Sequence, residues 1–465
     1  MDVLLSVVQY ILGFGAAVFV PLIMLIIGLL CKMKFSDAFV AALTLGVGFT
    51  GMNMLINFMT EAITPAAQGL ATATGISLPA IDVGWPALSA IAWAWPYGVL
   101  CFPLLIVINV IMLSLKLTDV LNVDLWNAWT KLCTCVITYY LCKSAGMAES
   151  VAIAMGFVAA AVQIVVELKI GDAVQPTIEH VTGIPGVTVP HALMLSCTMV
   201  LPFELILEKI PAIENNNIDA KWLRNKIGIF GENSVMGFII GLLLGAVAYR
   251  DPQKSLTLGV QAATAMQLFP MVSKLFMQAL SPISDAVGEW MKSKFNDGRT
   301  LYIGLDWPIV AGSNELWVTT ILIIPFEILF AVLLAPMGNT VLPFAGIINL
   351  CVAVPALFIA GGNLIKMVIL GIIGTPLYLM VASSFAGYCT KLAQTWSPDA
   401  LANMGSNPSI TWSTLECPDY RWVIVNGLSG HPVAIALLIV WLAGFVWLMK
   451  VMKQRNEVIN KELGH

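Results

Sequence analysis

The sequence predicts an all-α polytopic membrane protein of about eleven transmembrane helices, and three observations support this prediction. Apolar residues make up 59% of the 465-residue chain and charged residues only 11%, whereas soluble domains carry roughly 25% charged residues. Many apolar runs reach about 17–25 residues, the length of a helix that crosses a bilayer. Runs of that length exclude a transmembrane β-barrel, whose strands alternate over about 10 residues.

Charge and cysteine content narrow the function classes further. The formal net charge is −4 and there is no basic patch of useful length, so nucleic-acid binding is not indicated. The sequence has no Walker lysine motif and no glycine-rich strand–turn–helix pattern, so energy for any transport would come from an ion gradient or a partner protein. The nine cysteines lie mostly in apolar segments, where cysteine behaves as a small hydrophobe. We expect no metal or cofactor, and pairing of Cys389 with Cys417 across a polar loop stays open.

The predicted elements follow in order along the chain. Residues 6–30 form a retained first helix rather than a signal peptide, because the apolar run is too long and lacks a basic start. Residues 87–115 are too long for one simple helix and contain Pro96 and Pro103, which predicts a broken or re-entrant segment followed by a full span. The other predicted spans are residues 35–60, 126–145, 148–168, 235–249, 255–280, 308–336, 341–360, 365–388 and 432–450.

Several segments between these spans are predicted to be irregular or polar. Residues 186–210 are apolar but contain Pro190, Pro202 and Glu204, so we expect a discontinuous segment there. Residues 61–79 are predicted to form an interfacial helix followed by a turn. The remaining polar segments, predicted to contain no span of their own, are residues 171–185, 214–232, 281–299 and 390–429.

Basic loops predict the orientation in the membrane, because Lys and Arg concentrate on the cytoplasmic side. About eleven spans with an external N-terminus and a cytoplasmic C-terminus place all three basic clusters on that side. These clusters are Lys32 and Lys34; Lys221, Arg224 and Lys226; and Lys453, Arg455 and Lys461.

An internal repeat organises the chain. LTLGV at residues 43–47 is repeated identically at residues 256–260, and IDVGWP at residues 81–86 returns as IGLDWP at residues 303–308. AITP before the first of these motifs likewise returns as ALSP before the second. Matches in the same order indicate a tandem duplication. The predicted domains are a first membrane repeat at 1–210, a cytoplasmic linker at 211–233, a second membrane repeat at 234–431, and a final helix with a cytoplasmic tail at 432–465.

The repeat predicts a transporter. If each half holds five spans, the odd number inverts the second half relative to the first, and inverted repeats with broken helices are typical of secondary-type transporters. The substrate site then lies where the two equivalent breaks face each other. This places Asp82 and Asp306 near one pocket, and a carboxylate at the entrance of a membrane-length segment is by default a functional candidate.

Each residue of the two motifs also has a structural interpretation. Asp82 and Asp306 can accept hydrogen bonds from substrate hydroxyls or cap a short helix that begins at the Trp-Pro step, and the two roles are compatible. Trp85 and Trp307 can stack on a sugar face, yet tryptophan at a membrane interface is routine. Asp306 directly precedes its tryptophan, whereas Val83 and Gly84 separate Asp82 from Trp85, so Asp306 is the stronger candidate for direct contact.

Two further groups are candidates for the site. His191 is the only one of four histidines well inside an apolar stretch. Its imidazole can bind hydroxyls or act as a base toward a hydroxyl in phosphoryl transfer, or it can bond a backbone carbonyl freed by Pro190. Asn127 and Thr130 lie one helical turn apart and, with Trp126, can form a polar face; hydrogen bonding between helices is the alternative.

At these motifs the chain resembles the membrane (IIC) component of the galactitol-type, phosphoenolpyruvate-dependent sugar phosphotransferase system, a group similar to the ascorbate transporters of the same system. The resemblance covers almost the whole chain. The motifs that carry it are DVGWP at 82–86, NVDLWN at 122–127, PH at 190–191, EKIP at 208–211, GLD at 304–306, VLPF at 341–344, GNL at 362–364 and SITW at 409–412.

The resemblance implies a homodimer of inverted five-helix repeats in the bacterial cytoplasmic (inner) membrane, with a core that moves elevator-fashion. It also implies that a polyol or sugar is carried inward and phosphorylated by a cytoplasmic IIB protein on a phosphocysteine, itself served by a IIA protein. No residue of this chain is then expected to be phosphorylated. The implied substrate-binding residues are Asp82, Val83, Gly84, Trp85, Trp126, Asn127, Thr130, His191, Asp306 and Trp307, with His191 and Asp306 as candidates for a catalytic role.

Two other functions stay open on the sequence. An ion-coupled secondary transporter of a small polar substrate would deliver that substrate unmodified. A membrane sensor or scaffold could retain the same fold without transport. Dependence on a soluble partner with a reactive cysteine distinguishes the phosphotransferase function from both.

Overall fold

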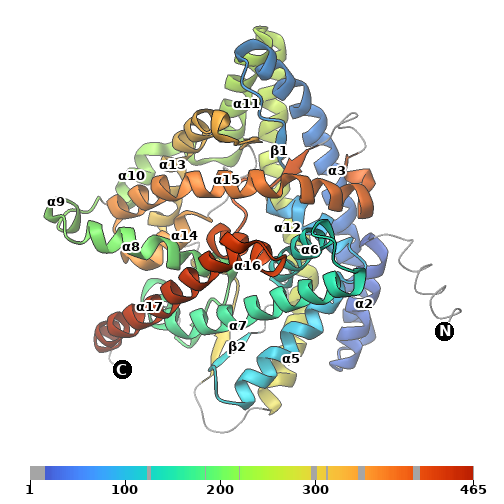
Figure 1. Ribbon diagram of the computed structural model, residues 1–465, viewed down its shortest axis with the longest axis vertical. Coiled ribbons are helices and arrows are strands. Elements are labelled where there is room, and N and C mark those ends of the chain that lie inside the picture. Colours follow the sequence, from blue (N-terminus) through green and yellow to red (C-terminus); the bar gives the residue numbers. More distant parts are fainter. Residues whose placement is uncertain are drawn as a thin grey trace, which may run out of the picture.

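The structure is a computed structural model that describes residues 16–122, 127–183, 185–218, 220–294, 301–310, 313–343, 351–401 and 409–463. In this part of the chain the fold is predominantly helical (Figure 1). The start of the predicted first span lies outside these ranges. The α-helices are α2 (Ala16–Leu30), α3 (Phe35–Thr74), α4 (Gly84–Trp93), α5 (Cys101–Ser114), α6 (Ala128–Ser144), α7 (Glu149–Thr182), α8 (Cys197–Leu207), α9 (Pro211–Glu214), α10 (Ala220–Ile227), α11 (Asn233–Tyr249), α12 (Pro252–Lys294), α13 (Asn314–Leu333), α14 (Ala353–Ala360), α15 (Leu364–Trp396), α16 (Pro418–Leu428) and α17 (Pro432–Leu463).

Apolar helices of membrane-spanning length support the predicted class. Among the described residues α3, α7, α15 and α17 are each long and apolar enough to cross a membrane, and the bent pair α4 and α5 provides a fifth candidate. Shorter apolar helices accompany them, including α2, α11 and the C-terminal part of α13. Figure 1 shows α3 and α11 side by side near the top of the view, where both pack with α12, while α7, α16 and α17 lie together lower down.

Several helices are longer than predicted. Residues 61–79 were expected to leave the membrane as a separate interfacial helix, but α3 continues through Pro65 to Thr74. Residues 171–185 were expected to be turn-rich, but α7 continues through Pro176 to Thr182. Polar residues end an apolar run without ending the backbone hydrogen bonds, so apolar length alone underestimates these helices. In the same way α12 runs unbroken to Lys294, α15 reaches Trp396 and α17 reaches Leu463.

The predicted breaks are confirmed at two places, and a third break was not predicted. The α4–α5 pair bends by 102° at a short connection that contains Pro96, which cannot donate a helical hydrogen bond. Residues 186–210 form a strand, a 3₁₀-helix and α8 in succession. The predicted span at residues 341–360 is wrong, because that segment begins as a strand and ends in the eight-residue α14.

Two short parallel sheets, which the sequence did not predict, lie among the helices. In one, β1 (Ala80–Asp82) pairs with β5 (Val341–Leu342) and β6 (Ile410–Thr411). In the other, β4 (Tyr302–Gly304) pairs with β2 (Val120–Asn122) and β3 (Val187–Thr188). The central strand of each sheet carries a copy of the repeated motif, and both of its partners come from the other part of the chain.

Candidate functional site

His191 and Asp306 meet at one edge of the β2–β4–β3 sheet. His191 follows β3 by three residues, and Asp306 follows β4 by two. Because β3 and β4 are parallel neighbours, their carboxyl ends point to the same edge, and His191 Nε2 lies 3.5 Å from Asp306 Oδ1. The structure therefore brings together two of the candidate residues that the sequence indicated. Their contact with a substrate stays a prediction.

One hydrogen bond sets the orientation of the imidazole. The Leu193 backbone N–H donates to His191 Nδ1 at 3.1 Å, at the start of the 3₁₀-helix η2 (Ala192–Ser196). In the neutral ring the proton is then on Nε2, which is directed toward Asp306 and, at 3.8 Å, Glu416 Oε1. Both distances exceed the roughly 2.7–3.2 Å of a direct hydrogen bond. The imidazole and the two carboxyl groups therefore keep hydrogen-bonding capacity that a hydroxyl group beside them can use.

Asp82 anchors the loop that follows β6. The backbone N–H and the hydroxyl of Ser413 donate to Asp82 Oδ1 and Oδ2 at 3.1 and 2.7 Å. The N–H of Gly84, the first residue of α4, also donates to Oδ1 at 3.1 Å. Asp306 Oδ1 accepts from the Trp307 N–H at 2.6 Å in the same way, at the start of the 3₁₀-helix η4 (Trp307–Val310). Each carboxylate thus accepts the N–H of the first residue of a helix, although the N-cap residue of α4 is Val83, which makes no side-chain cap hydrogen bond.

Val83 and Gly84 shape the turn between β1 and α4. The Val83 N–H donates to the Thr411 carbonyl at 2.9 Å, and its side chain is buried. Gly84 has φ +72°, a left-handed conformation that side chains disfavour. Their arrangement accounts for both residues structurally, and a direct substrate contact of either stays a prediction.

Tryptophans from three elements pack beside this turn. The ring of Trp85 stacks on Trp129 of α6 with centroids 6.1 Å apart, and Trp129 lies 5.5 Å from Trp412 in the loop after β6. Trp307 is half-buried and packs against the main hydrophobic core. Trp126 lies outside the described residues. Stacking of Trp85 or Trp307 on a sugar therefore stays a prediction.

The polar face of α6 joins α7. The Thr130 hydroxyl donates to the Asn127 carbonyl at 3.0 Å, and Gln163 Nε2 of α7 lies 3.3 Å from the Thr130 oxygen. Thr130 and Asn127 are 0% and 2% exposed. In this conformation Thr130 thus takes part in hydrogen bonding between helices, which was the alternative to a role in the site.

Sequence reasoning missed a buried charged network next to this face. Lys131 of α6 forms an ion pair with Glu167 of α7, and each side chain is 1% exposed. Gln163 also donates to Glu167 Oε1 at 2.7 Å. Arg421 of α16, fully buried, donates to the Thr134 hydroxyl at 3.1 Å and reaches the Thr130 carbonyl at 3.4 Å. Lys131, a lysine within the predicted span 126–145, was the available sequence signal, whereas Arg421 lies in the segment 390–429 that was predicted to be polar.

Glu416 was also missed. It lies in the loop between β6 and α16, is 4% exposed, and its Oε2 atom has no hydrogen-bond partner among the described residues. Burial raises the pKa of the Glu416 carboxyl to about 8, although the nearby Arg421 guanidinium opposes this shift. Burial thus favours the neutral acid, which can donate a hydrogen bond as well as accept one.

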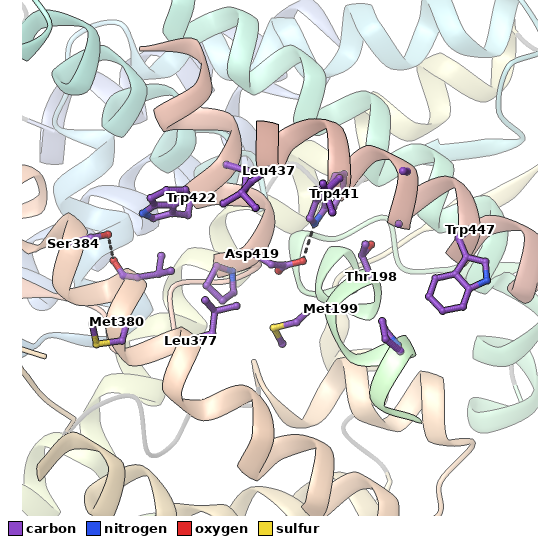
Figure 2. Close-up of a pocket in the computed structure, with 17 residues that line it drawn as sticks. Thr198, Met199, Leu377, Met380, Ser384, Asp419, Trp422, Leu437, Trp441 and Trp447 are labelled. Atoms are coloured by element: carbon purple, nitrogen blue, oxygen red, sulfur yellow. Dashed lines mark hydrogen bonds between the residues drawn. The ribbon is translucent and has the colours of Figure 1, made fainter. Parts of the chain in front are cut away.

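A large apolar groove is partly lined by α16. It has a volume of about 990 Å³ and is lined by α8, α15, α16 and α17 (Figure 2). The Asp419 carboxylate is one of its few polar groups, and both its oxygens are occupied, by Ser196 Oγ and by Trp441 Nε1. This lining offers few partners to a polyhydroxylated ligand, so we do not assign the sugar site to it. Cys389 and Cys417 are both buried free thiols, so they do not pair here.

Gly304 allows β4 to lie close to β2 and to the segment that carries His191. A Cβ atom there would lie 2.8 Å from Pro190 Cγ and 3.0 Å from the Asn122 Cα atom. Gly304→Val is therefore expected to push β4 away from the segment that carries His191 and to weaken substrate binding at least about 10-fold. Equilibrium binding to the purified protein checks this. Gly387→Val, at a position where a Cβ meets nothing within 4 Å, is the control; equal binding by both variants would contradict the prediction.

The long apolar helices and the nearly solvent-free polar cluster between them define the class as a membrane permease for a small polar solute. Residues 10–400 match the family described as EIIC-GAT, the PTS system sugar-specific permease component. The chain belongs to this family.

Curated relatives agree with the family assignment. The chain is 32% identical over 422 residues to the "PTS system galactitol-specific EIIC component" of Escherichia coli (strain K12), a match that covers 88% of this chain and 90% of the relative. The protein of the same description from Escherichia coli O157:H7 gives the same identity and coverage. Family membership thus favours the phosphotransferase function over an ion-coupled transporter that leaves its substrate unmodified.

Proposed function

We propose that this permease carries galactitol, or a closely related polyol or sugar, for phosphorylation by a cytoplasmic IIB protein that a IIA protein recharges. The observation that carries the proposal is the 32% identity to a galactitol-specific component along most of both chains. The phosphodonor cysteine would belong to IIB, which is consistent with the burial of all the cysteines here except the half-buried Cys31.

The chemistry of the cluster around His191 supports a polyhydroxylated substrate. Asp306 offers an acceptor and His191 Nε2 a donor, 3.5 Å apart, which suits a hydroxyl group that both donates and accepts. His191 is 1% exposed and the Asp306 side chain 18%. A substrate therefore needs a movement of the surrounding elements to enter or leave, as alternating access requires.

We further propose the inverted-repeat, elevator-type homodimer that the family resemblance implies, with repeats at 1–210 and 234–431. The reciprocal pairing of the strands supports this division. β1 with its motif takes both partners from the second half, and β4 with its motif takes both from the first. Equivalent strands thus occupy equivalent places in two sheets, as two halves related by an approximate twofold axis would require.

The proposed location is the bacterial inner membrane, with the N-terminus outside and the C-terminus cytoplasmic. Contacts between basic and acidic residues near the C-terminus support a common side for three segments. Arg455 of α17 contacts Glu204 and Glu208 at 2.6 Å each, and Lys366 at the start of α15 contacts Glu204 at 3.0 Å. The end of α8, the start of α15 and the tail of α17 therefore meet at one face.

Transport in vesicles tests the proposed function. Right-side-out vesicles are loaded with IIA, IIB and the phosphoenolpyruvate-dependent components, and are then given labelled galactitol or another polyol from a panel. We expect accumulation of the sugar phosphate, and none when IIB is omitted. Accumulation of unmodified polyol that depends on a sodium or proton gradient would instead support the ion-coupled alternative.

A further inference from the structure

We propose that Glu416 is a further substrate-binding residue, which completes a donor–acceptor triad with His191 and Asp306 for two neighbouring hydroxyls of an acyclic polyol. The inference rests on the proposed function and names a residue outside the repeated motifs.

The position of Glu416 is fixed from two sides. Asp82 holds Ser413 through two hydrogen bonds, so the first motif determines the path of the loop that carries Glu416. On the C-terminal side, Cys417 has φ +45° and Pro418 begins α16. Between these anchors Glu416 Oε1 lies 3.8 Å from His191 Nε2, on the nitrogen that also approaches Asp306.

The second carboxyl oxygen of Glu416 indicates a missing partner. Glu416 is 4% exposed, and its Oε2 atom makes no hydrogen bond among the described residues. A buried polar atom without a partner costs about 1–3 kcal/mol, so such atoms in native proteins usually face water or a ligand. For a carboxyl group whose other oxygen, Oε1, lies 3.8 Å from His191 in a permease for polar solutes, a substrate hydroxyl is the fitting partner of Oε2.

The alternative is that Glu416 only neutralises Arg421. The hydrogen bonds described for Arg421, however, go to the Thr134 hydroxyl, the Thr130 carbonyl and Cys133 Sγ. Arg421 is thus held by α6 without a hydrogen bond to Glu416. Burial also favours the neutral acid at Glu416, which can donate to one substrate oxygen while accepting from another.

The three groups match a vicinal diol. Asp306 accepts, His191 Nε2 donates, and the Glu416 acid supplies one donor and one acceptor, so two adjacent hydroxyls can exchange bonds with all three. A ligand with a single hydroxyl, or one whose hydroxyls are separated by methylene groups, leaves part of the triad unpaired and binds more weakly.

Three substitutions and a control test the proposal by equilibrium binding of galactitol and a set of monodeoxygalactitols to the purified protein. Glu416→Ala is expected to weaken galactitol binding about 10–100-fold. Glu416→Asp, which withdraws the carboxyl by one methylene, should weaken it at least about 5-fold, and Glu416→Gln, which keeps a donor and an acceptor, by no more than about 3-fold. Asp419→Asn is the control, since Asp419 lies three residues away on α16 but lines the apolar groove (Figure 2).

Binding of the deoxy compounds distinguishes a direct contact between Glu416 and the substrate from an indirect structural effect of the substitution. In the wild type, removing the hydroxyl that meets Glu416 should weaken binding about 10-fold, whereas in Glu416→Ala the same removal should change binding less than about 2-fold. Thermal unfolding of each variant shows whether the fold is retained. Undiminished galactitol binding by folded Glu416→Ala, or equal losses with every deoxy compound in both proteins, would overturn the inference. Failure of the wild type to bind any polyol would instead overturn the proposed function.

Discussion

His191→Ala is expected to abolish polyol uptake and to weaken binding at least about 100-fold while the protein stays folded. The substitution removes the Nε2 donor that faces both Asp306 and Glu416, and a buried carboxyl left without its partner is costly. Asp306→Asn should have a comparable effect on uptake, because it removes the negative acceptor and keeps the shape. Vesicle uptake and equilibrium binding measure both.

The chain offers a matched control for the loss of the imidazole. His431 likewise accepts a backbone hydrogen bond, from the Ala434 N–H at 3.4 Å, at the start of α17. His431→Ala therefore removes the same kind of helix-start hydrogen bond and should leave uptake close to wild type. Wild-type binding in His191→Ala or Asp306→Asn would remove that residue from the site.

Lys131→Met is expected to destabilise the protein by about 3–5 kcal/mol, the usual cost of leaving one member of a buried ion pair alone. Its partner Glu167 is 1% exposed and would keep only the hydrogen bond from Gln163. The double substitution Lys131→Met with Glu167→Leu should recover most of the loss, because apolar pairs of similar volume replace buried ion pairs at little cost. Thermal unfolding in detergent measures the difference.

An exposed pair on the same two helices provides the comparison. Lys143 lies 2.9 Å from Glu149, with side chains 37% and 55% exposed, so solvent screens their attraction. Lys143→Met should shift the unfolding temperature little. If Lys131→Met shifted it equally little, the Lys131–Glu167 pair would not be a stabilising element of the α6–α7 contact.

Two breaks in the fold could be predicted from prolines inside apolar runs, although proline alone does not predict a break, because α3 and α7 continue through Pro65 and Pro176. Pro96 marks the bend between α4 and α5, and Pro190 lies where β3 gives way to η2. Helix ends were predicted poorly, since α3 and α7 pass through polar residues that look like loop. The strands could not be predicted at all: two or three residues show no alternation, and their partners lie far away in the sequence.

Within the site, the sequence indicated the residues that stand out from their surroundings. His191 is a lone histidine in an apolar stretch, and Asp306 belongs to a repeated motif, so each could be named as a candidate, whereas their proximity follows from the pairing of β3 with β4. Glu416 and Arg421 lie in a polar segment where charges suggest only solvation, and their burial follows from the packing of α16 against α6, a tertiary fact. The burial of Lys131 likewise depends on tertiary packing, because in the sequence it stands near the start of a predicted span, where a lysine can reach solvent.

The strand pairing also constrains the order in which the two sheets can form during synthesis. β1 leaves the ribosome early, yet its neighbours are β5 and β6, at residues 341–342 and 410–411. The other sheet is complete once β4 has been synthesised, at residue 304. β1 therefore lacks both of its strand partners through most of translation. A nascent chain that stops before β6 leaves the backbone groups along one edge of β1 unpaired. Such a truncated product should be a target for membrane proteases, whereas one lacking only the C-terminal part of α17 has both sheets closed.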